Sequence, residues 1–162
     1  MSAEARIRRA LVAEAAALTD LVMRSKAMWG YDQRFMAMCL DELTVRPAWI
    51  EAGAAWVAED GDRLAGMLVV AVHGGNLEVH MIFVEPDRTR SGVGRALWAH
   101  AEARARELGL ATLTLDADPN AVPFYERMGM RVVGESPSGS VPGRMLPRME
   151  KRLAADPASR AA

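Results

Sequence analysis

Several features are scarce in this chain, and each scarcity excludes a class of protein. The sequence has one cysteine, Cys39, so it cannot form an internal disulfide and suits a reducing compartment. We expect Cys39 to be a small buried hydrophobic residue. No apolar run reaches the roughly 18 residues of a membrane-spanning helix, and the first residues lack the apolar core of a signal peptide. We therefore expect a cytoplasmic protein with no membrane partner.

An excess of one charge is also lacking. The chain has 20 basic and 21 acidic residues and a formal net charge of −1. Because its arginines are scattered among as many acids, we expect no nucleic-acid partner. The sequence also predicts no metal site. Hydrophobic residues make up 51% of the 162 positions, which is enough for one domain with a sizeable core. We expect a single domain over residues 1–152 and a disordered tail over residues 153–162.

The most informative segment lies at residues 78–98 and reads EVHMIFVEPDRTRSGVGRALW. A mostly apolar strand is predicted from Leu77 to Val84. It should stop pairing at Glu85–Pro86, because proline cannot donate to a strand ladder. A basic turn with two glycines follows, and a helical pattern then runs from Val93 to Leu108.

This strand, turn and helix start together predict an anion site. Backbone N–H groups at a helix N-terminus lack partners, and the helix dipole favours negative charge there. Arg88, Arg90 and Arg95 add positive charge, while Gly92 and Gly94 would let a phosphate approach the backbone. We therefore expect a ligand that carries phosphates.

Nucleotide-binding motifs fit this segment less well. A P-loop needs four residues between its glycines and a lysine after the second, whereas one residue separates Gly92 from Gly94. A dinucleotide fingerprint needs a third glycine where this chain has Leu97, although Asp116 lies near the expected acidic position. A plain strand–helix connection with glycines for tight packing remains an alternative for this segment alone.

A second segment, residues 116–135, reads DADPNAVPFYERMGMRVVGE. Together the two segments resemble the GNAT superfamily of acyl-CoA-dependent N-acyltransferases. The family's pyrophosphate motif, (Gln/Arg)-x-x-Gly-x-(Gly/Ala), matches Gly92 and Gly94, with Thr89 as a departure in its first position. The resemblance covers residues 54–152 well and the first fifty or so residues only by topology.

The family's late motif is an aromatic residue, then Tyr-Glu-x-x-Gly-Phe. It matches residues 124–126 and Gly129, with Met130 in place of the final phenylalanine. The resemblance implies an α/β fold of the mixed α+β kind. Its central sheet would be mixed but mostly antiparallel, splayed at the CoA site and flanked by helices. The hairpin series followed by βα units favours the same arrangement.

The resemblance implies acetyl-CoA as the cosubstrate. Backbone groups of Ile82, Phe83 and Val84 would bond its pantetheine arm. The pyrophosphate would be wrapped by Arg90, Ser91, Gly92, Val93, Gly94, Arg95 and Ala96. Asn120 is either a further cofactor contact or an N-cap of the short helix. The spacing departs from the family pattern, since the usual asparagine position, seven before the tyrosine, is Asp118 here.

Three residues are candidates for proton transfer. By resemblance, Tyr125 is the general acid that protonates the departing thiolate, and its alternative is a packed tyrosine on an amphipathic helix. Glu78 is the candidate base, and as an acid in an apolar strand its pKa should rise toward neutrality. His80 should face the same side and either relay the proton or replace Glu78. Alternatively, both face solvent.

Trp29, Tyr31 and Asp32 lie between the first two helical patterns, where the family usually builds its acceptor wall. Aromatic faces with one carboxylate suit a cationic amine. Alternatively, these side chains form a hydrophobic contact between the two helices. We expect direct acetyl transfer from acetyl-CoA to a primary amine, borne by a small molecule or a protein, in a possible homodimer. The alternatives are a non-catalytic acyl-CoA sensor and an unrelated nucleotide-binding α/β domain.

Overall fold

The computed structural model describes residues 5–154, in which all strands join one seven-stranded sheet of order β1-β2-β3-β4-β5-β7-β6. The strands are β1 (Arg6–Arg9), β2 (Ala55–Asp60), β3 (Arg63–His73), β4 (Asn76–Val84), β5 (Thr112–Asp116), β6 (Arg131–Pro137) and β7 (Met145–Arg152). Neighbouring strands are antiparallel except β4 and β5, which are parallel. The predicted mixed, mostly antiparallel sheet is confirmed. Of the predicted tail, residues 155–162 lie outside the described residues.

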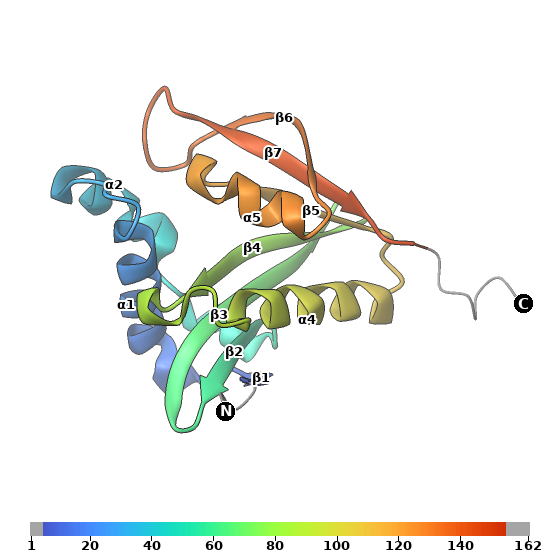
Figure 1. Ribbon diagram of the computed structural model, residues 1–162, viewed down its shortest axis with the longest axis horizontal. Helices are drawn as coiled ribbons and strands as arrows, with labels where there is room; N and C mark the ends of the chain where they lie inside the picture. Colours follow the sequence, from blue (N-terminus) through green and yellow to red (C-terminus); the bar gives the residue numbers. More distant parts are fainter. Residues whose placement is uncertain (1–4, 155–162) are drawn as a thin grey trace, which may run out of the picture.

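Helices cover both faces of this sheet (Figure 1). The α-helices are α1 (Ala15–Ala27), α2 (Gln33–Leu43), α3 (Pro47–Glu51), α4 (Val93–Glu107) and α5 (Val122–Arg127). Short 3-10 turns are η1 (Val12–Glu14), η2 (Pro86–Arg88) and η3 (Pro119–Ala121). The hairpin series followed by βα units is thus confirmed, and the last helix leads into the left-handed Gly129.

Two hydrophobic cores lie on opposite faces because side chains alternate along each strand. On β2, Trp56 and Ala58 pack into the core beneath α4 and α5, whereas Val57 packs into the core beneath α1 and α3. Helix α2 packs against α1, and Cys39 is buried within it as expected. The core beneath α4 and α5 continues to Leu115 on β5 and Met149 on β7, whereas the core beneath α1 and α3 ends at β4.

The division lies between β4 and β5. These strands pair only at Leu77–Leu113 and Glu78–Thr114. Beyond Glu78 they diverge toward the end of the molecule that carries the start of α4 and helices α1 and α2 (Figure 1). Pairing with β5 therefore stops at Glu78, whereas pairing with β3 continues to Val84, so the strand ends before Glu85–Pro86 as predicted. The splayed sheet itself is confirmed.

A β-bulge in β4 lies just beyond the last β4–β5 pair. Val79 pairs with Val70 and Met81 with Val69, so His80 is the extra residue. In consequence Val79 faces the core beneath α4, while Met81 faces the core beneath α1. In a regular strand these two residues, which are two positions apart, would point to the same face. The sequence pattern indicated an uninterrupted strand and gave no sign of this change of face.

Leu97 tests the core beneath α4, because its side chain is fully buried there. We expect Leu97→Ala to lower the free energy of unfolding by about 3 kcal/mol, through lost transfer energy and a cavity. Leu108→Ala, at the exposed end of the same helix, is the matched control and should change it by less than about 1 kcal/mol. Urea denaturation measures both, and equal losses would contradict this packing.

Candidate active site

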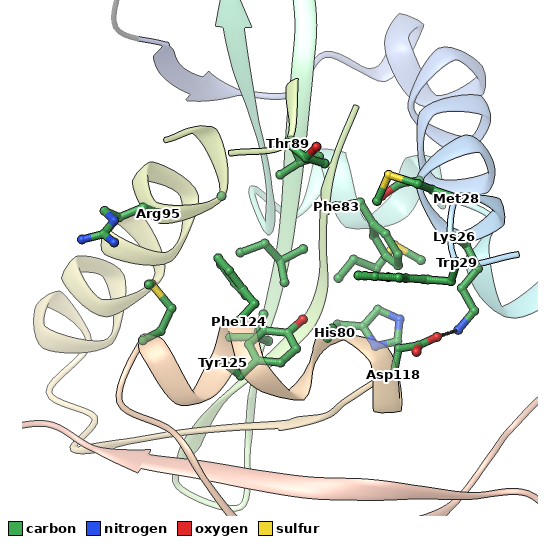
Figure 2. A pocket seen from close by; sticks show the side chains of 18 of the residues that line it. Lys26, Met28, Trp29, His80, Phe83, Thr89, Arg95, Asp118, Phe124 and Tyr125 are labelled. Carbon is green, nitrogen blue, oxygen red and sulfur yellow. Dashed lines mark hydrogen bonds and ion pairs between the residues drawn. The ribbon is translucent and has the colours of Figure 1, made fainter. Parts of the chain in front are cut away.

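A cavity of about 1330 Å³ occupies the opening between β4 and β5 (Figure 2). Its wall combines the C-terminal ends of α1 and α2, strand β4, the turn before α4, the end of β5 and helix α5. These segments lie far apart in the sequence, and the divergence of the two strands brings them around one space. The cavity is larger than the usual range for a drug-sized ligand, about 300–1,000 Å³.

The turn before α4 forms one end of this cavity. Gly92 caps the helix with φ 91°, and Arg90 adopts the same left-handed region with φ 64°. The first N–H that closes a helical bond belongs to Ala96, which donates to the Gly92 carbonyl at 3.0 Å. The preceding N–H groups of the first turn therefore have no partner within the helix, and they offer an anion site.

Two of the three expected arginines remain available to an anion. Arg88 instead pairs with Asp60 at 2.8 Å. Arg90 and Arg95 are exposed, line the cavity and form no ion pair with another described residue. The Thr89 hydroxyl, at the position where the family motif has glutamine or arginine, donates to a backbone carbonyl of its own turn.

Gly94 lies where α4 approaches α5 closely. A Cβ added there would lie 3.2 Å from the ring of Phe124 and 3.6 Å from a methyl group of Val84. Glycine thus keeps this part of the cavity open. Ser91, Val93 and Ala96 are absent from the wall, so their predicted contacts to a pyrophosphate rest on backbone groups and remain predictions.

The free edge of β4 forms the floor of the cavity. Ile82, Phe83 and Val84 all line it, and they lie beyond the last residue that pairs with β5. Their backbone groups on that edge have no ladder partner in the described part of the chain. This edge is the kind of surface to which an extended ligand can add main-chain hydrogen bonds.

Tyr125 and His80 point into the same cavity from α5 and β4 (Figure 2). Tyr125 is 8% exposed and packs edge-on against Trp98 and Phe124. Burial raises the pKa of the Tyr125 phenol, and the negative charge of Asp118 raises it further, so the hydroxyl stays protonated. His80 is exposed, and its ring lies edge-on to Trp49 with centroids 4.9 Å apart.

Glu78 also lines the cavity, but its carboxylate is fully engaged. Arg148 donates to both oxygens, at 2.6 and 2.8 Å, and the Thr114 hydroxyl donates at 2.5 Å. Burial alone would raise the pKa of Glu78, but the hydrogen bonds from Arg148 and Thr114 outweigh it and hold that pKa below its usual value. The expected rise toward neutrality is therefore wrong, because the sequence did not reveal Arg148.

Asp118 organises the far side of the cavity. It accepts from Lys26 at 2.7 Å, from the Tyr31 hydroxyl at 2.9 Å and from the Asn120 amide at 3.0 Å. Burial raises the pKa of Asp118, but hydrogen bonds from Lys26 and from the backbone of Asn120 bring it below its usual value. Asp118, and not Asn120, caps the turn η3, and the Asn120 side chain is not part of the wall.

The three predicted acceptor residues do not lie together. Trp29 lines the cavity and is 44% exposed. Tyr31 instead stacks on Phe35, with ring centroids 4.1 Å apart, and Asp32 caps α2 by accepting from the backbone N–H of Phe35. Tyr31 and Asp32 are absent from the wall. The wall also contains residues that were not predicted from the sequence, among them Lys26, Met28, Glu42 and Leu146.

The chain belongs to the GNAT acetyltransferases, because a family model described as "Acetyltransferase (GNAT) domain" matches residues 31–153. It is 36% identical over 96 residues to a mycothiol acetyltransferase of Clavibacter michiganensis, covering 57% of this chain and 31% of that protein. It is 30% identical over 96 residues to a peptidyl-lysine N-acetyltransferase, YjaB, of Salmonella typhimurium, covering 59% and 58%. The chain thus spans about a third of the length of the mycothiol acetyltransferase.

Solved structures share the fold over almost the whole chain. The PaiA N-acetyltransferase of Thermoplasma acidophilum, in complex with coenzyme A, has a TM-score of 0.79 at 17% identity and covers 93% of this chain and 100% of its own. YncA of Salmonella typhimurium, with acetyl-CoA, has a TM-score of 0.68 at 21% identity and covers 95% and 96%. At these identities the likeness confirms the fold.

No helix in residues 5–154 is long and apolar enough to cross a membrane. Within the same range, no three His, Cys, Asp or Glu side chains gather closely enough to hold a metal ion.

The Glu78–Arg148 pair predicts a pH-dependent stability. At about pH 7, Glu78→Gln should lower the free energy of unfolding by about 2 kcal/mol, because Arg148 loses a charged hydrogen-bond partner. Since the folded-state pKa of Glu78 is depressed, its contribution is complete above the unfolded value of about 4.3 and is lost as pH falls through the folded value.

The difference between the wild type and Glu78→Gln should therefore shrink as pH falls below about 4. Chemical denaturation at several pH values measures it. Glu126→Gln, at an exposed position on α5, is the control and should show no such trend. A difference that persists unchanged in acid would contradict an ion-pair role for Glu78.

Proposed function

We propose that this chain is an N-acetyltransferase that transfers an acetyl group directly from acetyl-CoA to a primary amine. One observation carries the proposal: an anion-accepting helix start and the free edge of β4 open into a single cavity that also holds Tyr125 and His80. Family membership supports it, and so do related folds solved with coenzyme A or acetyl-CoA. We also propose that the protein is cytoplasmic and forms a homodimer.

The proposed cofactor position follows the cavity from end to end. Its pyrophosphate would lie on the N–H groups that open α4, with Arg90 and Arg95 supplying charge. The pantetheine arm would add to the free edge of β4 at residues 82–84. The thioester would then lie between β4 and α5, beside Tyr125. Asn120 takes no part in this proposal, because its amide is bound to Tyr31 and Asp118.

In the proposed reaction the neutral amine attacks the thioester carbon. The carbon–nitrogen bond forms and the carbon–sulfur bond breaks, so the nitrogen must lose a proton and the sulfur must gain one. Tyr125 suits the second step, because its buried hydroxyl is protonated and makes no hydrogen bond with another described side chain. Positioning both reactants accounts for much of the rate.

For the base we propose His80 in preference to Glu78. An effective base has a pKa near the working pH, and imidazole is the side chain that most often takes this role. Glu78 has a lowered pKa, and its two oxygens already accept from Arg148 and Thr114. We propose that Glu78 holds Arg148 in place and keeps the cavity wall rigid.

On the acceptor side we keep Trp29 and assign Tyr31 and Asp32 to supporting roles. Trp29 offers an exposed aromatic face to the cavity, and such a face suits a cationic amine. Tyr31 and Asp32 fix the connection between α1 and α2 through Asp118 and the cap of α2. The acceptor amine itself is not named by the proposal.

The proposal is tested by incubating the protein with acetyl-CoA and a panel of amines. Release of free thiol that depends on the amine, with an acetylated product by mass spectrometry, is the expected result. Acetyl-CoA binding without turnover of any amine would favour the alternative, a non-catalytic sensor. A larger rise in melting temperature with ATP or NAD than with acetyl-CoA would favour an unrelated nucleotide-binding role.

Gly94→Glu tests the cofactor position. The new side chain would collide with the Phe124 ring and place negative charge beside the proposed pyrophosphate, so acetyl-CoA should no longer raise the melting temperature. Gly134→Glu is the matched control, because that glycine lies on the exposed strand β6 with open space around it. Normal acetyl-CoA binding by Gly94→Glu would overturn the position.

Tyr125→Phe tests the general acid. We expect kcat to fall by about 100-fold, within the usual range for a positioned acid, with little change in acetyl-CoA affinity. Thermal melting of the variant checks that the ring still packs against Trp98. Full activity in this variant would remove Tyr125 from the proposed mechanism.

A further inference from the structure

The cavity wall carries four carboxylates, and three of them form ion pairs. Arg148 lies 2.6 Å from Glu78 and 3.2 Å from Asp116. Lys26 lies 2.7 Å from Asp118. Glu42 is the fourth, and among residues 5–154 it forms no ion pair. Glu42 is therefore the wall carboxylate whose charge no described side chain pairs directly.

Glu42 is nevertheless held in a fixed place. It accepts from the Ser140 hydroxyl at 2.5 Å, although Ser140 belongs to the connection between β6 and β7. The carboxylate also lies against Gly139, where an added Cβ would be 2.8 Å from one of its oxygens. Two segments far apart in the sequence thus orient this side chain. A neutral hydroxyl donor orients the charge without cancelling it.

The position of Glu42 in α2 makes a positive partner more favourable still. It lies in the last turn of the helix, where the dipole is negative and cations are usually stabilising. That turn contains no basic residue, although Arg46 just beyond it donates to the carbonyl and the carboxylate of Asp41, at 3.0 and 2.8 Å. Arg46 is therefore engaged with Asp41, and the carboxylate of Glu42 is left for a cation from outside the described chain.

Apolar surface from α1 completes this part of the wall. Met28 and Trp29, which follow the last turn of α1, both line the cavity and are 43% and 44% exposed. Figure 2 shows both side chains directed toward the cavity. An aliphatic stem can lie on such side chains while its charged end reaches a carboxylate.

The reacting nitrogen cannot be the partner of Glu42 during transfer, because it must be uncharged when it attacks the thioester. We propose that the acceptor carries a second amine that stays protonated while the first reacts, and that Glu42 binds this second amine while the aliphatic stem lies on Trp29 and Met28. The substrate class would then be a diamine or a longer amine with separated charges. This inference rests on the proposed function and narrows its acceptor.

The test compares matched acceptors in the wild type and in Glu42→Gln. Putrescine and cadaverine carry two amines, and butylamine and pentylamine are the corresponding monoamines. We expect kcat/KM to be at least roughly tenfold higher for the diamines in the wild type, equivalent to about 1.4 kcal/mol. Glu42→Gln should remove this advantage by lowering kcat/KM for the diamines much more than for the monoamines.

Asp41→Asn is the control, since it removes an equal charge from the adjacent position of α2 and is absent from the cavity wall. It should keep the diamine preference. Equal losses for diamines and monoamines in Glu42→Gln would overturn the proposal, and so would a wild type that prefers monoamines.

Binding separates this inference from the proposed acetyl transfer. Calorimetry measures cadaverine binding to the wild type and to Glu42→Gln, each loaded with CoA. Binding that the variant loses would support the cation site even if no amine were acetylated. An absence of cadaverine binding by the wild type would overturn the site, whether or not other amines were acetylated.

Discussion

The loss of pairing between β4 and β5 is the constraint on which the site depends. Only two residue pairs join these strands before they diverge, so the sheet is continuous at one end and open at the other. The opening exposes an edge of β4 and leaves room for α5 to bring Tyr125 beside it. Such a gap would normally leave unpaired backbone groups, and a ligand with amide groups of its own can satisfy them.

Ion pairs between distant segments hold this opening in shape. Arg148 joins β7 to Glu78 on β4, Lys26 joins α1 to Asp118 after β5, and Arg24 joins α1 to the buried Glu85 after β4. Glu78, Lys26 and Asp118 belong to the cavity wall, whereas Arg24 and Glu85 lie outside it. These charged side chains are held in ion pairs that stabilise the fold. The candidate catalytic groups are therefore Tyr125 and His80, whose side chains form fewer polar interactions.

The sequence predicted the elements that local patterns encode and missed those set by long-range contacts. The turn with Gly92 and Gly94 and the strand before it follow from neighbouring residues, and both are present. Arg148 lies 70 residues after Glu78, so no local pattern could show that it would hold down the pKa of that carboxylate. The separation of Trp29 from Tyr31 and Asp32 likewise depends on contacts in the folded chain. Tyr31 stacks on Phe35 and donates to Asp118, and Asp32 accepts from the backbone N–H of Phe35, so neither side chain lines the cavity.

The bulge at His80 has a consequence for how this strand tolerates change. It moves every later side chain of β4 to the opposite face, so Met81 and Ile82 fill the two cores in the reverse order from an ideal strand. A deletion of one residue would therefore be felt on both faces at once, whereas a substitution at His80 would be felt in the cavity and at Trp49. Strand length, and not only residue identity, is under constraint at the centre of this domain.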